Sequence, residues 1–415
     1  MKRLISASAF VLSAAALAHA DVPGAARALF DATTTTDRDK ALAELDAARA
    51  ADPLASYSAG AGHFFLALEG LAQDLHRHGF ETPQSLMLPL MRMPIPPNAS
   101  PEPLTYEQFR AMLSDFRDRL DDASERLASV PQGADIGIDV DLTRAGIDMD
   151  GNGAIDRATE SLAGIMAAIG GGGLPTPDEA TQPLTFRFDR ADGYWLDGYA
   201  HVLMAQADFW LAHDFRQAFE QSFHALFPRA SLPMQDALVP LDMDAEGNIF
   251  ASEWRLADFV SFFHLVNWPV VEPERRKQAR LDMLQMIALS RQNWQAILAE
   301  TDNDREWLPG PQQPGMHALT GLQVTQNEVD AWHQALAMAE DLLEGRKLMP
   351  HFRIADRGVD MKKFFEEPTT FDLVLSITGP GVVPYLRQGP MLTSEEFWGM
   401  ANRFESFMAF AIWFN

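Results

Sequence analysis

Acidic side chains recur at every second position in one short stretch of the chain. Residues 242–253 read DMDAEGNIFASE, and Gly247 stands in the middle, where the backbone can turn sharply. A hard divalent cation takes about six to eight oxygen ligands, and alternating side chains on a tightly wound loop converge on one point. The spacing therefore predicts a cation site with these ligands, Asn248 acting through its backbone carbonyl: Asp242, Asp244, Glu246, Asn248 and Glu253.

A second stretch with the same spacing lies upstream, at residues 148–159, which read DMDGNGAIDRAT. Its last residue is Thr159, and Glu160 comes one position later. Either Glu160 reaches the ion from a shifted register, or Thr159 supplies one weak oxygen and the closing carboxylate is lost. The candidate ligands, with Ala154 acting through its backbone carbonyl, are Asp148, Asp150, Asn152, Ala154, Asp156 and Glu160.

Both stretches resemble the calcium-binding loop of EF-hand proteins, D-x-[DN]-x-[DN]-G followed by five residues and Glu. Glu246 replaces the second Asp/Asn in one loop, and Thr159 replaces the closing Glu in the other. The resemblance covers these two segments only. It implies calcium, with a trivalent lanthanide as an alternative because four carboxylates suit a more highly charged ion. EF-hand loops usually work in pairs, so we expect Ile155 and Ile249 to exchange an antiparallel backbone bridge.

Neither stretch follows a convincing helix. Pro240 stands two residues before Asp242, where its ring would clash with a preceding helical turn, and Gly146 holds the same offset before Asp148. The apolar pattern after each stretch predicts an exit helix. The alternative reading of such a stretch is an acidic turn that caps the helix behind it.

The rest of the chain is typical of a mainly α, multi-helical globular body with few short strands. Hydrophobic spacing and capping signals predict helices over residues 37–50, with Asp37 as the N-cap, and over 55–78, 106–129, 191–227, 273–300, 326–345 and 394–410. Alternation predicts strands at 184–188 and 351–356. The glycine-rich residues 169–183 are the best candidate for a linker.

The N-terminus is typical of a secretory signal peptide. Residues 1–20 combine Lys2 and Arg3 with a short apolar run and an A-x-A cleavage site ending at Ala20. We therefore expect a periplasmic or secreted protein. The expected organisation is an N-terminal helical lobe at 21–170 with the first loop and a C-terminal helical lobe at 184–415 with the second, or one continuous domain.

The formal net charge of −25 indicates which partners the protein attracts. Such acidity argues against binding to nucleic acid or to anionic membrane surfaces, and it favours the binding of divalent cations. The apolar run of the leader is too short to span a bilayer. No protein partner is indicated.

Motifs of known enzymes are missing from the sequence. It contains no H-E-x-x-H, no G-x-S-x-G, no phosphate-binding glycine loop and no cysteine. His201, His213 and His224 fall on one expected helix, roughly 16–18 Å apart along its axis, too far to share an ion. We name no catalytic residue and favour a non-enzymatic calcium-binding protein. The alternative is an exported hydrolase with structural calcium and an active site that no motif shows.

Overall fold

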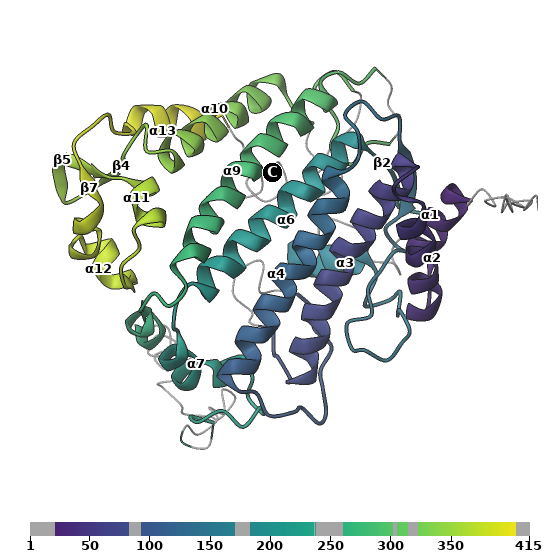
Figure 1. Ribbon diagram of the computed structural model, residues 1–415, viewed down its shortest axis with the longest axis horizontal. Coiled ribbons are helices and arrows are strands. Elements are labelled where there is room, and N and C mark those ends of the chain that lie inside the picture. The colour runs from purple at the N-terminus through teal and green to yellow at the C-terminus, as the bar shows by residue number, and fades with distance from the viewer. Residues whose placement is uncertain are drawn as a thin grey trace, which may run out of the picture.

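The computed structural model of the 415-residue chain describes residues 21–82, 93–170, 183–235, 237, 260–301, 305–313 and 323–403. Long helices lying side by side form the centre of this part of the molecule (Figure 1). Helix α4 packs against both α3 and α6, and α6 packs against α9 along its length. The bounds of the four are α3 (Pro53–Arg77), α4 (Tyr106–Ala128), α6 (Arg190–Leu211) and α9 (Pro273–Ile297).

The prediction of a mainly α, multi-helical body with few short strands is confirmed. One hydrophobic core runs through it and includes the fully buried Leu45, Leu120 and Trp294. These residues come from both sides of the expected linker, so the segments on either side of residues 169–183 share this core. Among the described residues, no helix is both long enough and apolar enough to cross a membrane.

Helix starts are set by local capping. Thr105 and Gln108, Thr325 and Glu328, and Thr393 and Glu396 each form a reciprocal capping box. These boxes begin α4, α10 (Gln326–Leu343) and α13 (Ser394–Ala401).

Three helix predictions need correction. The helix expected over 394–410 ends at Ala401, and residues 404–410 lie outside the described part of the chain. Helix α2 (Thr35–Ala48) is capped by Thr34, whose hydroxyl accepts the N–H of Asp37, so Asp37 is not the N-cap. The helix expected over 191–227 ends at Leu211, because the chain leaves the helix to pair His213 with Val270. It resumes as α7 (Arg216–Ser222) and the short 3₁₀ helix η2 (Phe223–Ala225).

The strands form small antiparallel sheets. Strand β1 (Gly137–Asp141) pairs with β2 (Thr185–Asp189), which contains most of the strand expected at 184–188. The strand expected at 351–356 is interrupted by a turn, which joins β4 (Met349–His351) to β5 (Ile354–Val359). The other strands are β3 (Asn267–Trp268), β6 (Phe371–Asp372) and β7 (Leu386–Arg387).

The remaining helices flank the central ones. Helices α1 (Val22–Asp31) and α2 pack against each other and against α3, and lie at one end of the molecule in Figure 1. Helix α5 (Leu162–Gly170) follows the first predicted ion loop. The C-terminal part carries α11 (Met361–Glu366), α12 (Leu373–Thr378) and the 3₁₀ helix η3 (Pro380–Tyr385), at the opposite end of the molecule.

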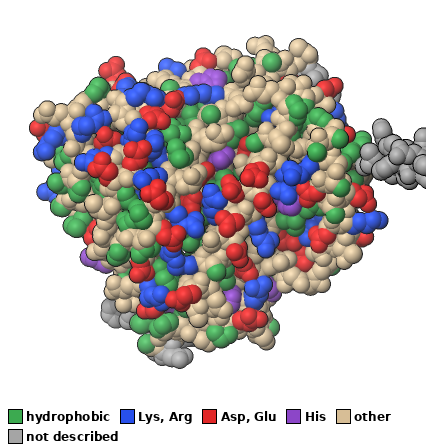
Figure 2. Space-filling view, in the orientation of Figure 1, with side chains coloured by type: hydrophobic (Ala, Val, Ile, Leu, Met, Phe, Trp, Pro, Cys, Tyr) green, Lys and Arg blue, Asp and Glu red, His purple; other side chains and the backbone are tan. Residues whose placement is uncertain are grey.

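Acidic and basic side chains are interspersed on the face drawn in Figure 2. Ion pairs also connect helices around buried carboxylates. Asp208 of α6 contacts Arg117 of α4 at 3.3 Å and Arg275 of α9 at 2.6 Å. Pairs of this kind connect neighbouring helices of the central layer.

Candidate metal centre

The first predicted ion loop lies between β1 and α5 and is closed at its neck by backbone pairing. Gly146 bridges Ser161 in antiparallel fashion, and the Ile147 N–H donates to the Glu160 carbonyl at 3.1 Å. A Cβ on Gly146 would lie only 2.4 Å from that carbonyl oxygen, so the close approach requires glycine. The loop is therefore not entered from a helix, as the sequence predicts, and the exit helix begins at Leu162.

Asp148 organises the first half of the loop. Its Oδ1 accepts the N–H groups of Gly151 and Asn152 at 2.8 and 3.2 Å, and its Oδ2 accepts the N–H of Gly153 at 2.9 Å. Gly151 and Gly153 have φ values of 73° and 86°, which glycine adopts without strain. The backbone thus winds tightly around one carboxylate.

Glu160, and not Thr159, closes the loop. Its Oε1 accepts the Met149 N–H at 2.7 Å, and its Oε2 accepts the Asp156 N–H at 2.8 Å. The Thr159 hydroxyl instead donates to Asp156 at 3.1 Å. The sequence leaves two alternatives open, and the geometry agrees with the one in which Glu160 supplies the closing carboxylate. The backbone pairing of Gly146 with Ser161 places this carboxylate one residue later than in the EF-hand pattern.

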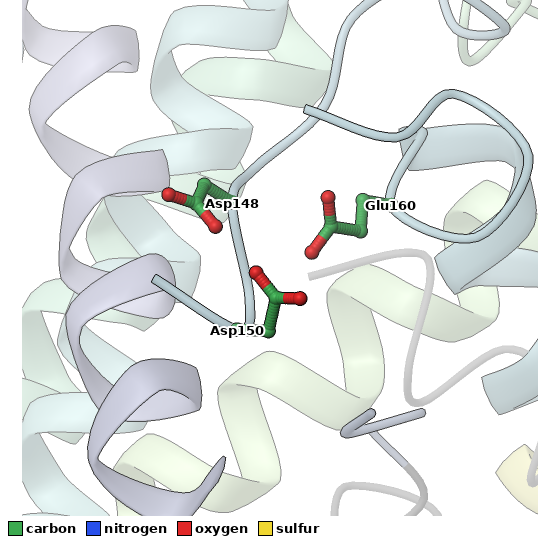
Figure 3. Close-up of side chains that lie close together, drawn as sticks. All are labelled: Asp148, Asp150 and Glu160. Atoms are coloured by element: carbon green, nitrogen blue, oxygen red, sulfur yellow. The ribbon is translucent and has the colours of Figure 1, made fainter. Parts of the chain in front are cut away.

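One carboxylate oxygen from each of Asp148, Asp150 and Glu160 lies within 4.8 Å of the other two. Figure 3 shows the three side chains directed toward a common space. A carboxylate has about four lone-pair sites. Asp148 accepts three hydrogen bonds, and Asp150 and Glu160 accept two each. Each group therefore retains capacity to bind a cation.

The other candidate ligands of this loop are placed differently. Asn152 turns its amide oxygen to the Ala154 N–H at 2.8 Å and donates its amide to Asp150 at 3.0 Å. Asp156 accepts the Ala158 N–H at 3.0 Å and so caps the turn before α5. Among the Asp and Glu side chains of the loop, only those of Asp148, Asp150 and Glu160 are brought together.

Burial shapes the electrostatics of this group. Asp148 and Glu160 are 1% and 2% exposed. Burial raises the pKa of Glu160, the neighbouring Asp150 and Asp148 raise it further, and the two backbone N–H donors lower it. Three carboxylates so close together repel one another unless a proton or a cation offsets their charge.

Helix α3 supports the loop through residues that sequence reasoning missed. Glu69 accepts the Asp148 N–H at 2.8 Å and forms a buried ion pair with Arg38. Gln73 donates its amide to the Asp148 carbonyl at 2.8 Å. Glu69 and Asp148 are 79 residues apart, so no local spacing in the sequence could have indicated the contact.

The second predicted loop lies outside the described residues. This applies to Asp242, Asp244, Glu246, Asn248 and Glu253, and to Ile249. The expected bridge between Ile155 and Ile249 is nevertheless wrong at Ile155, because its N–H donates to the Thr33 carbonyl at 2.9 Å.

The prediction that His201, His213 and His224 lie on one helix is wrong. His201 lies on α6, His213 follows the end of that helix, and His224 lies in η2. His213 is fully buried, and its ring Nδ1 contacts the Phe209 carbonyl at 2.6 Å. Burial lowers the pKa of His213 to about 4, and Arg276 and Arg110 act in the same direction.

A serine, a histidine and an aspartate meet between the central helices. The His201 Nδ1 contacts Asp282 of α9 at 2.8 Å, and its Nε2 contacts the Ser124 hydroxyl of α4 at 3.3 Å. This order matches a nucleophile, a base and an orienting carboxylate. Ser124 is 7% exposed and lies inside α4, where the backbone N–H groups bond to carbonyls four residues earlier. The helix therefore offers no N–H pair to stabilise an oxyanion.

Comparisons of this chain with protein-family models, curated proteins and solved structures gave no match. The geometry of the loop is therefore the basis for assigning a function.

Proposed function

We propose that the protein is an exported calcium-binding protein whose loop 148–160 holds one ion. The observation that carries the proposal is the convergence of Asp148, Asp150 and Glu160 within 4.8 Å. These hard oxygen donors are the type that calcium prefers, and each retains capacity to bind a cation. Backbone N–H groups hold Asp148 and Glu160 in place, so little ordering is required when the ion binds.

The ion would supply positive charge where the fold concentrates negative charge. Burying an ionised carboxylate without a counter-charge is costly, and Asp148 and Glu160 are almost completely buried. Calcium would offset that cost and link the start of the loop to its end. A trivalent lanthanide uses the same oxygens, and parallel titrations with calcium and terbium distinguish the two ions.

The proposal includes residues 242–253 as a second ion loop and residues 1–20 as a cleaved leader. Both rest on the sequence patterns. The Glu253→Gln variant should remove one ion per chain from the binding stoichiometry. Mass spectrometry of the exported protein should find a chain that begins at Asp21.

Calcium titration of the mature protein by calorimetry tests the central claim. Exported proteins meet abundant calcium, so we expect Kd values of about 10⁻⁴–10⁻³ M. Calcium at ten times Kd should stabilise the native state by about 1.4 kcal/mol per site. For a chain of this length that corresponds to a melting temperature about 2 °C higher per site. If no heat is released and a chelator leaves the melting curve unchanged, the loop is an acidic turn and the proposal fails.

A hydrolase with structural calcium is the second candidate, and the contact of Ser124, His201 and Asp282 favours it. Burial of the serine and its position inside α4 count against it. An activated ester or a fluorophosphonate probe decides the matter. Labelling of the wild-type protein that disappears in Ser124→Ala would establish the enzyme, and the absence of labelling would reject this site.

A further inference from the structure

The connection between α1 and α2 runs alongside the ion loop and forms an isolated antiparallel bridge with it. The Ile155 N–H donates to the Thr33 carbonyl at 2.9 Å, and the Thr35 N–H donates to the Gly153 carbonyl at 3.1 Å. Thr34 and Ala154 form the antiparallel bridge between these two bonds. Residues 33–35 therefore occupy the place where a paired EF-hand loop would have its partner loop.

This pairing fixes the direction of the Ala154 carbonyl. In an extended segment, successive residues direct their backbone groups to opposite edges. The Gly153 carbonyl and the Ile155 N–H both face residues 33–35, so the backbone groups of Ala154 face the other edge. The Ala154 N–H accordingly donates to Asn152 within the loop. Its carbonyl is thus turned toward the loop interior, where the sequence predicts a ligand.

Other contacts join the same N-terminal segment to the loop. Arg157 donates to the Asp31 carbonyl at 3.1 Å, and Arg144 pairs with the Asp31 carboxylate at 3.2 Å. Arg38 of α2 pairs with Glu69, which in turn accepts the Asp148 N–H. The loop is therefore held by α1, by α2 and by the residues between them.

We propose that residues 33–35 are the second backbone segment of the ion site and couple ion binding to the docking of α1 and α2. The inference rests on the proposed function, because it assumes that the loop binds calcium. A bound ion would hold Gly153–Ile155 in the paired geometry and so strengthen its bonds to Thr33 and Thr35. Linkage is reciprocal, so an event that releases the N-terminal helices would weaken calcium binding by the same factor.

The variant Thr35→Pro removes one of the two bonds with little other change. Thr35 is the first residue of α2, a position that favours proline, and Thr34 before it has the extended conformation that proline requires (φ −133°, ψ 149°). Proline lacks the N–H that donates to Gly153. The matched control is Thr35→Ala, which keeps the N–H. Both variants lose the long 3.5 Å hydrogen bond from the Thr35 hydroxyl to the Gly153 carbonyl, so the difference between them reports the backbone bond.

Calorimetry should show weaker calcium binding in Thr35→Pro, by up to about fivefold. That limit corresponds to one net hydrogen bond of about 1 kcal/mol that is made fully only when the ion is bound. Thr35→Ala should bind like the wild type. Hydrogen exchange of the wild-type protein, which needs no variant, should show slower exchange in α1 and α2 when calcium is present.

The outcomes separate this inference from the proposed function. Suppose that the wild type binds calcium, that Thr35→Pro binds it with the same affinity, and that calcium does not change hydrogen exchange in α1 and α2. The coupling is then refuted, and the proposed ion site stands. If the wild type binds no calcium, the proposed function fails and the coupling fails with it. Equal weakening in Thr35→Pro and Thr35→Ala would show that the backbone bond is not the link.

Discussion

The Glu160 carboxylate accepts the backbone N–H of Met149 at 2.7 Å, so the residue that ends the ion loop is tied directly to its second residue. Its other oxygen holds the Asp156 N–H. One side chain therefore joins the start of the loop to its final turn, and one of its oxygens lies within 4.8 Å of carboxylate oxygens of Asp148 and Asp150. Closure of the loop and binding of a cation both depend on this single glutamate.

Glu160→Gln should lower calcium affinity at this loop by at least tenfold, because it removes a charged ligand that can bind with both oxygens. Thr159→Ala should change the affinity little, since the Thr159 hydroxyl donates to Asp156. The exposed Glu44→Gln serves as a control for the loss of one negative charge. Calorimetric titration of the three variants provides the comparison. Equal losses in Glu160→Gln and Thr159→Ala would show that the assignment of the closing ligand is wrong.

Gly146→Ala should destabilise the protein by roughly 1–3 kcal/mol, the usual cost of forcing atoms into a tightly packed position. The new Cβ would meet the Glu160 carbonyl at 2.4 Å and the Ile155 side chain at 2.8 Å. Gly399→Ala is the matched control, because nothing lies within 4 Å of a Cβ there and alanine favours α13. Denaturant titration measures both. A Gly146→Ala protein as stable as the control would mean that the neck can open without cost.

Glu69→Gln should cost about 3 kcal/mol of unfolding free energy, because it leaves the buried Arg38 guanidinium without its buried partner. It should also weaken calcium binding, since Glu69 holds the Asp148 backbone. The control is Glu274→Gln, whose partner Lys277 is exposed, and its effect should stay below about 1 kcal/mol. Similar effects of the two substitutions on unfolding free energy would argue against a structural role for the Arg38–Glu69 pair.

His213 should make the protein less stable as the pH falls from about 6.5 to about 4. In the unfolded chain it takes up a proton near pH 6.5, whereas in the folded protein burial lowers its pKa to about 4. The unfolded state therefore binds more protons in this window, and up to about 3 kcal/mol of stability is lost. His213→Phe should flatten the dependence of unfolding free energy on pH there. The lost bond to Phe209 changes the level of stability at every pH, so the slope is the informative quantity.

The sequence by itself determined the features that depend on neighbouring residues. The capping boxes at Thr105, Thr325 and Thr393 were predictable because the two partners lie three residues apart. The convergence of Asp148 and Asp150 was predictable for the same reason, since the glycines and alternating carboxylates that wind the loop are local. Hydrophobic spacing was sufficient to predict a mainly helical body.

Tertiary structure decided what depends on contacts between distant segments. The choice of Glu160 over Thr159 follows from the antiparallel neck at Gly146 and Ser161, which shifts the closing carboxylate by one residue. The hydrogen bond to Glu69 and the backbone bridge at Thr34 join the loop to segments 79 and more than 100 residues away. Contacts over such separations depend on how the helices pack, and packing leaves no periodic signal in the sequence around either partner.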